Sequence, residues 1–138
     1  MNSNLVPSLE CILDRDLAHK IIERSVEVIT QDGILFRQGE SGDCLYFVQW
    51  GEVSLTMLVG NKEIRIRAGR GSLLGLPAVF GYLPYTMTAK ATWDAEIFKI
   101  SSNAFTELLN REPRMKETVL QVLAGEVRAI RQAFSQLI

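Results

Sequence analysis

Hydrophobic and polar residues follow three different patterns along the chain. Over residues 8–25 the apolar positions recur at helical spacing. Over residues 26–100 short runs of β-branched and aromatic residues alternate with turn residues, and after residue 100 helical spacing returns. The pattern therefore predicts N-terminal helices over 8–25, a β-rich region over 26–100 and C-terminal helices over 101–138.

The β-rich region contains seven candidate strands, separated by turns that carry Gly, Asn, Asp and Ser. The runs are VEVI, ILFR, CLYFVQW, EVSLTMLV, EIRIRA, YTMTAKA and AEIFKI. Gly60 and Asn61 both tolerate a positive φ, so they indicate a tight hairpin. Over residues 63–67 Ile and Arg alternate, which gives one apolar and one polar face. Strands at such intervals predict a β-sandwich, barrel or roll.

Polar residues mark where several helices should begin. Asp14 or Asp16 is suited to start a helical segment, because Asp favours caps and first turns. Ser101 or Ser102 can cap the first C-terminal helix in the same way. Pro113 fits the first position of a long final helix, which we expect to end near residue 137. No linker or low-complexity segment interrupts the chain, so residues 1–138 are expected to form one domain.

The final helix carries two apolar stripes. The first repeats at alternating spacings of three and four residues, the seam of a coiled coil: Leu120, Leu123, Val127, Ile130, Phe134 and Leu137. The second stripe widens the apolar surface: Val119, Val122, Ala129 and Ala133. Because two stripes cover more than one surface, we expect a parallel homodimer through the first and packing on the β-region through the second. Gly125 indicates the close approach of a neighbouring element.

Composition adds limits on the partners of the chain. The 138 residues are 47% hydrophobic and 22% charged, an ordinary balance for a globular protein, with a net charge of −1 and a pI near 5.9. This charge gives no overall attraction to nucleic acid or to anionic membranes. No apolar run approaches the length of a membrane span, and the first residues lack the features of a signal peptide. We therefore expect a cytoplasmic protein without membrane association.

The segment from Ile34 to Val53 resembles the signature of the cyclic-nucleotide-binding fold. Turns at Gly39 and Gly51 bracket the run Leu45–Val48, and Gly51-Glu52-Val53 opens the next strand. The resemblance implies an eight-stranded antiparallel β-roll, jelly-roll-like, with N-terminal helices and a long C-terminal dimerisation helix. Among proteins of this fold, the chain is most similar to the catabolite-activator/FNR class of bacterial regulators.

The same resemblance places the ligand cassette, where this chain departs from the family. A short helix should cradle the cyclic phosphate, a Glu should bind the ribose 2′-hydroxyl, and an Arg after a Pro should bind the phosphate. Aligned on Gly75 and Pro84, the chain has Leu76 in the place of the Glu and Tyr85 in the place of the Arg. Pro77 also removes one backbone N–H at the start of the helix.

Three readings of this pocket remain open. Its candidate residues are Gly75, Leu76, Pro77, Ala78, Tyr82, Tyr85 and Thr86. The pocket takes an unknown effector that is more apolar or aromatic than a cyclic nucleotide, or it is filled and takes no ligand. In the third reading a cyclic nucleotide still binds through another cation, for which the basic candidates are Arg65, Arg67 and Arg70.

The chain is poor in residues for catalysis and for metal binding. His19 is the one histidine, so the three imidazole or carboxylate ligands of a cupin-like metal site are not expected. Cys11 and Cys44 lack the spacing of a metal or cluster site and are expected to be buried thiols. Haem ligation by His19 or Cys44 has no supporting partner residue. No nucleophile has a nearby base motif, so we expect neither a cofactor nor enzymatic activity.

Together these observations predict a sensor domain of a catabolite-activator/FNR-type transcription regulator that does not respond to cAMP. The alternative is a stand-alone module that regulates a partner and still binds a cyclic nucleotide or another small molecule. A domain of a kinase or channel agrees less well with the coiled-coil-like helix. DNA is expected as a partner only if a helix-turn-helix follows Ile138, because the basic residues of this chain are scattered.

Overall fold

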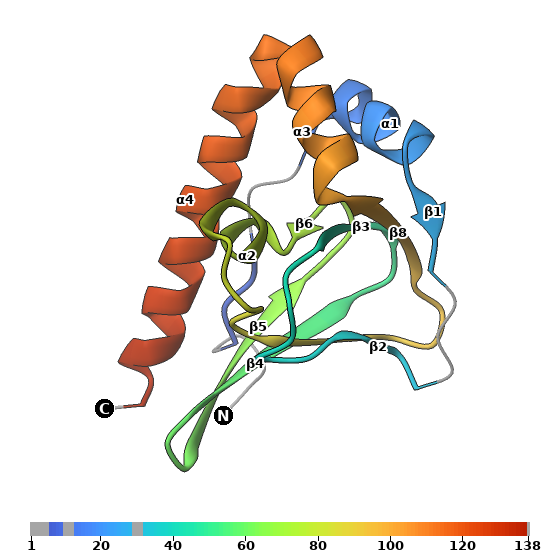
Figure 1. The fold of residues 1–138 in the computed structure, drawn as a ribbon. Helices are drawn as coiled ribbons and strands as arrows, with labels where there is room; N and C mark the ends of the chain where they lie inside the picture. The colour runs from blue at the N-terminus through green and yellow to red at the C-terminus, as the bar shows by residue number, and fades with distance from the viewer. Residues whose placement is uncertain (1–5, 10–12, 29–31, 138) are drawn as a thin grey trace.

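The computed structural model describes residues 6–9, 13–28 and 32–137, and it is a β-roll flanked by helices (Figure 1). Eight strands form two four-stranded antiparallel sheets, ordered β1-β8-β3-β6 and β2-β7-β4-β5. The strands are β1 (Val26–Glu27), β2 (Ile34–Phe36), β3 (Cys44–Trp50), β4 (Val53–Val59), β5 (Lys62–Ala68), β6 (Leu73–Leu74), β7 (Thr88–Ala91) and β8 (Glu96–Ser101). The helices are α1 (Arg15–Glu23), α2 (Leu76–Gly81), α3 (Ser102–Arg111) and α4 (Pro113–Ser135). The predicted fold class is confirmed.

Local sequence signals account for most of the element boundaries. Val59 pairs with Lys62 across a two-residue turn, in which Gly60 has a φ of 65° while Asn61 keeps a negative φ. The Ser101 hydroxyl accepts a hydrogen bond from the Ala104 amide at 3.1 Å, and Pro113 lies in the first turn of α4. The predicted hairpin, cap and proline start are therefore confirmed.

The N-terminal helix is shorter than predicted. A helix from Ser8 is wrong, because Ser8 forms a parallel bridge with Arg67 and the Leu9 amide donates to the Arg67 carbonyl at 2.9 Å. The outer edge of β5 supplies these backbone partners, and a pattern of apolar positions does not show such pairing. The α1 helix begins after Asp14, whose carboxylate accepts from the Leu17 amide at 2.9 Å. The predicted start at Asp14 is confirmed, and residues 10–12 lie outside the described residues.

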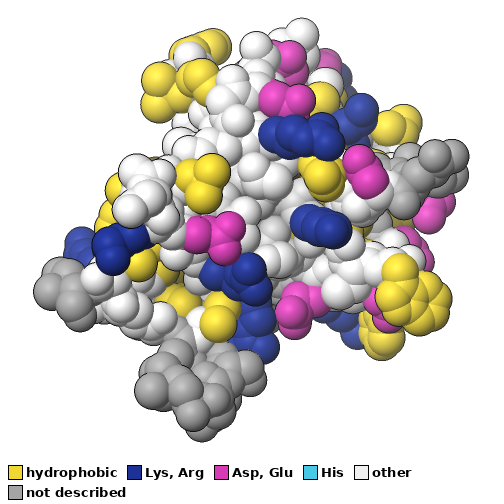
Figure 2. Space-filling view, turned by 90° about the horizontal axis from the view of Figure 1, so that it is seen from below, with side chains coloured by type: hydrophobic (Ala, Val, Ile, Leu, Met, Phe, Trp, Pro, Cys, Tyr) yellow, Lys and Arg dark blue, Asp and Glu magenta, His cyan; other side chains and the backbone are white. Residues whose placement is uncertain are grey.

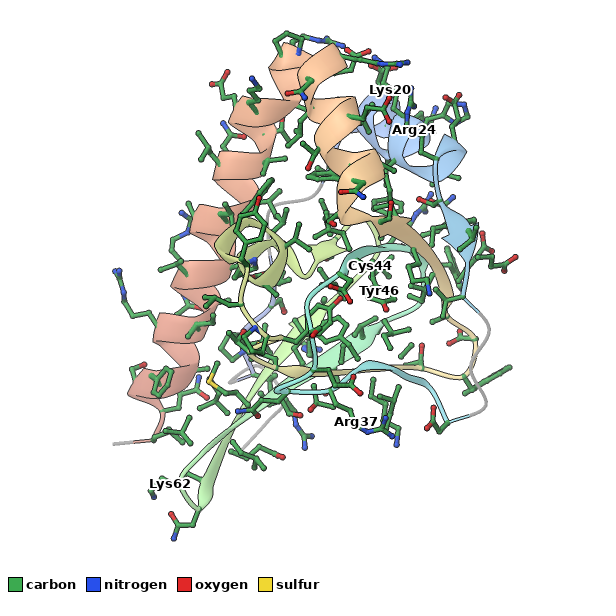
Figure 3. All side chains as sticks on the ribbon, in the orientation of Figure 1. Lys20, Arg24, Arg37, Cys44, Tyr46 and Lys62 are labelled. Carbon is green, nitrogen blue, oxygen red and sulfur yellow. The ribbon has the colours of Figure 1, made fainter. Side chains whose placement is uncertain are left out.

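The apolar side chains form two clusters. One fills the space between the sheets, where Tyr46 projects inward from β3 (Figure 3). The other joins α1, α3 and the first half of α4 to β3, β6 and β8. Lys20 on α1 adds an ion pair to Glu112, just before α4, with 2.8 Å between Nζ and Oε1. The α4 helix runs along the side of the roll and contacts both clusters (Figure 1).

Candidate functional site

A small cavity lies where α2 and α4 meet the roll. Its lining residues come from β2, β4, β6, α2, the segment before β7, and α4: Phe36, Leu55, Leu74, Gly75, Pro77, Ala78, Tyr85, Thr86, Met87 and Glu126. The free volume is about 20 Å³. A space of that size holds about one water molecule. A ligand larger than water therefore enters only if some of these side chains or α4 move.

The start of α2 depends on a glycine. Gly75 is the N-cap of α2, with a φ of 100° and no side-chain cap. A Cβ at this position would lie 3.1 Å from the Cys44 carbonyl oxygen and 3.3 Å from the Tyr85 ring. Both the left-handed backbone and the close approach of Tyr85 require a residue without a side chain. Pro77 in the first turn removes an N–H group that could have faced an anion.

Tyr85 fills the place where the resemblance expects a phosphate-binding arginine. Its ring stacks on Phe36 with 4.0 Å between the centroids and an angle of 19°. Its hydroxyl donates to the Cys44 carbonyl at 2.6 Å and accepts from the Cys44 amide at 3.3 Å. Burial raises the pKa of this phenol, so the side chain stays neutral. The hydroxyl is committed to β3 and not directed to a ligand.

Of the seven residues predicted to line the pocket, the structure brings five together. These are Gly75, Pro77, Ala78, Tyr85 and Thr86. Leu76 is fully buried and packs instead in the cluster beneath α1 and α3. Tyr82 is 96% exposed at the end of α2, where its φ of 53° turns the chain. Neither of these two lines the cavity, and ligand binding by the other five stays a prediction.

Glu126 is a lining residue that the sequence analysis missed. It is 7% exposed, and burial raises the pKa of its carboxyl group to about 7. It lies between Val122 and Ala129 on the stripe of α4 that faces the roll. Its spacing from these two residues is helical, so this position in the second stripe was the signal that could have revealed it.

The alternative cations predicted from the sequence lie away from the cavity. Arg65 pairs with Glu63 at 3.3 Å, Arg67 contacts Ser8 at 3.4 Å, and the Arg70 guanidinium lies 5.7 Å from the centre of the Trp50 ring. Within the described part of the chain, Glu126 is the one charged residue that lines the cavity. A cyclic phosphate would therefore meet a carboxyl group and an aromatic ring.

The two stripes of α4 face different surroundings. Val119, Val122, Ala129 and Ala133 are buried, so the prediction that the second stripe packs on the domain is confirmed. On the first stripe Leu120, Val127 and Phe134 are 66%, 54% and 37% exposed. Leu123, Ile130 and Leu137 are half-buried. The first stripe thus presents large apolar side chains to solvent along most of α4.

Among the described residues, the remaining candidates, His19 and Cys44, do not lie in a catalytic or metal-binding cluster. His19 lies on the surface of α1, 3.1 Å from Glu23. Cys44 is half-buried, and burial raises the pKa of its thiol, which disfavours the reactive thiolate (Figure 3). Cys11 lies outside the described residues. In residues 6–9, 13–28 and 32–137 no three His, Cys, Asp or Glu side chains are grouped to hold a metal ion.

The surface shows no concentration of basic charge on the face seen from below. There, Lys and Arg are interspersed with Asp and Glu, and hydrophobic side chains lie between them (Figure 2). This mixture does not form the continuous basic stripe that a nucleic acid backbone attracts. Among the described helices, none has the length and apolar character needed to cross a bilayer.

Comparisons with known proteins agree with this architecture. A protein of Rhodopseudomonas palustris that is named as a potassium channel protein is 27% identical to this chain over 120 residues. The match covers 87% of this chain and 29% of that protein. Patatin-like phospholipase domain-containing protein 6 of Homo sapiens is 27% identical over 95 residues, 67% of this chain and 7% of that protein. The chain therefore spans less than a third of either relative.

Solved structures with this fold include regulators of transcription. The catabolite activator protein of Thermus thermophilus is 25% identical with a TM-score of 0.67, and the match covers 91% of this chain and 59% of that one. The N-terminal domain of a transcriptional regulator from Streptomyces coelicolor is 25% identical with a TM-score of 0.62, over 88% and 89%. The family model for the cyclic nucleotide-binding domain matches residues 26–112, more than half of the chain. The chain belongs to the cyclic nucleotide-binding domain family.

Proposed function

We propose that residues 1–138 form a single, non-catalytic regulatory domain of a catabolite-activator/FNR-type transcription regulator, which does not respond to cAMP or cGMP. The family typically serves as a regulatory module, and transcription regulators are among the similar structures. A small-molecule effector is proposed to act by shifting α4 relative to the roll, because α4 forms one wall of the cavity.

The occupation of the phosphate place by Tyr85 is the observation that carries this proposal. The stack on Phe36 and the two hydrogen bonds to Cys44 hold the ring against Gly75. A phosphate there would lose a charged partner, at a cost of about 2–5 kcal/mol. Leu76 in the place of the ribose-binding Glu removes a second polar contact. Both losses together are expected to abolish micromolar affinity.

Glu126 strengthens the argument against an anionic ligand. Its carboxyl group lines the cavity in a setting that has no basic side chain among the described lining residues. An ionised carboxylate repels a phosphate, and the attraction or repulsion of two charges is larger in an apolar site than in water. The carboxyl group of Glu126 therefore disfavours a cyclic nucleotide, in addition to the loss of the polar contacts that Leu76 and Tyr85 replace.

Calorimetric titration of the chain with cAMP and with cGMP tests the proposal. We expect no binding heat beyond dilution at concentrations that saturate a site of micromolar affinity. Micromolar binding of either nucleotide would overturn it. In that case the reading in which a cyclic nucleotide binds through another cation would be correct.

We also propose that the chain forms a homodimer through the first stripe of α4. The support is the exposure of Leu120, Val127 and Phe134 along one line of the helix, a surface that an isolated domain leaves in water. Seams with this spacing pair two helices side by side. Light scattering of the purified chain is expected to give twice the mass of one chain, and a monomer would contradict the proposal.

A second candidate function is a module that regulates a fused or bound partner other than a DNA-binding domain. The channel and phospholipase relatives favour it, because the matched region is a small part of each of those proteins. The reading frame of the gene separates the two candidates. A helix-turn-helix encoded beyond Ile138 supports the transcription regulator, whereas a channel, a kinase or a hydrolase supports the alternative.

A further inference from the structure

Glu126 is a buried carboxyl group without a polar partner. It lies on the buried face of α4, 7% exposed, and no described residue forms a hydrogen bond or an ion pair with it. Desolvation by burial alone raises the pKa of its carboxyl group, so no nearby cation offsets it. The carboxyl oxygens are not among the fully enclosed polar atoms, but a largely buried polar group without a protein partner is costly, and a native one calls for an explanation.

Most of the residues that line the cavity with Glu126 are apolar. Phe36, Leu55, Leu74 and Met87 line the cavity with carbon and sulfur atoms. The Tyr85 hydroxyl donates its proton to the Cys44 carbonyl, so it offers none to Glu126. Thr86 also lines the cavity and is exposed, which places it towards solvent. The cavity thus combines one unpartnered acceptor with an apolar wall.

We propose that this cavity binds the cationic headgroup of a small ligand, an amidinium or guanidinium group, on the carboxylate of Glu126. An ionised carboxylate only accepts hydrogen bonds, and its two oxygens match the paired N–H groups of an amidinium or guanidinium. The inference rests on the proposed function, in which the roll senses a small molecule. It gives that molecule the charge opposite to the cyclic phosphate.

Binding of this headgroup would be coupled to α4. The free volume of about 20 Å³ holds about one water molecule, so even the headgroup alone enters only if the cavity rearranges. Met87 is a flexible wall residue that can rearrange, and α4 carries Glu126 itself. The same helix presents Leu120 and Val127 to solvent on another face. A ligand that draws Glu126 towards it therefore changes how the exposed stripe is presented.

The test uses two cations and their neutral counterparts: methylguanidine with methylurea, and benzamidine with benzamide. Each is titrated calorimetrically at pH 8 into the wild-type chain, into Glu126→Gln and into Glu117→Gln, a control on the exposed surface of α4. At least one cation is expected to bind the wild type and Glu117→Gln at least about tenfold more tightly than its neutral counterpart. Glu126→Gln is expected to lose that preference.

Other results overturn the proposal. These are the absence of binding by both cations, equal binding of each cation and its neutral counterpart, or an unchanged preference in Glu126→Gln. Thermal unfolding of Glu126→Gln shows whether it is folded, and we expect it to be at least as stable as the wild type at pH 8. A cAMP titration on the same samples separates the two proposals. If neither cAMP nor the cations bind, the headgroup proposal alone fails; if cAMP binds, the proposed function fails.

Discussion

The chemistry of the cavity is decided by Tyr85 and Glu126, which both line it. Tyr85 is held by a ring stack and by hydrogen bonds to Cys44, so it belongs to the structure of the roll as well as to the cavity. Glu126 has no such role, because it has no hydrogen-bonding partner among the described residues. The free energy of unfolding of a Tyr85 variant tests the first role, and the pH dependence of that free energy tests the burial of Glu126.

Tyr85→Phe is expected to destabilise the chain by about 1–2 kcal/mol, because it removes the hydroxyl that bonds both polar backbone groups of Cys44. The stack on Phe36 is kept. Urea unfolding measures the change, and Tyr82→Phe is the matched control because Tyr82 is 96% exposed. The control is expected to stay within about 0.5 kcal/mol of the wild type. Equal stability of the two variants would show that the Tyr85 hydroxyl has no structural role.

Glu126 should make the chain less stable as the pH rises. Its pKa of about 7 in the folded chain lies above the ordinary value of 4.5, so the folded state binds more protons between these values. Stability from this group is fully present below about pH 4.5, falls as the pH rises to 7 and is then constant, a total loss of about 3 kcal/mol. The other titratable group that lines the cavity is Tyr85, which stays protonated throughout.

Urea unfolding from pH 5 to pH 8 checks this dependence. Glu126→Gln is expected to remove most of the loss and so to be more stable than the wild type at pH 8, while Glu117→Gln keeps the wild-type profile. If the wild type and Glu126→Gln lose the same free energy of unfolding between pH 5 and pH 8, the carboxyl group of Glu126 is solvated in the folded chain.

At the scale of elements, α4 divides its two faces between the roll and solvent. The buried stripe fixes the helix on the sheets, and the exposed stripe is available to a second copy of the chain. Val127→Asp is expected to shift the dimer to monomer, because it places a charge in the middle of the seam. Gln132→Asp is the control, since Gln132 is exposed and lies about 140° around α4 from Val127, away from the seam. Light scattering at several concentrations that shows the same mass for both variants would contradict an interface at Val127.

Elements with local signals were predictable from the sequence. The alternation of Ile64 and Ile66 with arginines gave β5, and Asp14, Ser101 and Pro113 gave the helix starts. The residues around Ser8 were assigned to a helix because their apolar spacing is helical, but the edge of β5 pairs with them. The two-residue strand β6 is too short to produce a pattern of its own. The structure of the segment at Ser8 and the position of β6 are both decided by pairing with distant strands, which local sequence preference does not show.

The candidate site was predictable in part for the same reason. Gly75 and Pro77 are visible as local backbone signals, and Tyr85 follows from its place after a proline. Glu126 depends on which face of α4 packs on the roll, and a single acidic residue in a helix is usually solvated. Leu76 and Tyr82 lie beside cavity residues in the sequence, but the turn of α2 directs Leu76 into the core and leaves Tyr82 in solvent.

At the scale of the whole molecule, the chain keeps the scaffold of a cyclic nucleotide-binding domain and changes the polarity of its cavity. The two sheets and the long α4 agree with the fold of the catabolite activator protein of Thermus thermophilus, whose match covers 91% of this chain. The lining of the cavity has an acidic residue and no basic one among the described residues. This lining supports the proposal that the effector is not a cyclic nucleotide.

Amide NMR spectra of the labelled chain, recorded with and without about 1 mM cAMP, test this claim most directly, since that concentration saturates a site of micromolar affinity. Gly75, Ala78 and Thr86 line the cavity, so their amide resonances report on a ligand bound there. We predict that none of the three resonances shifts. Saturable shifts of these resonances, with a micromolar dissociation constant, would contradict the account.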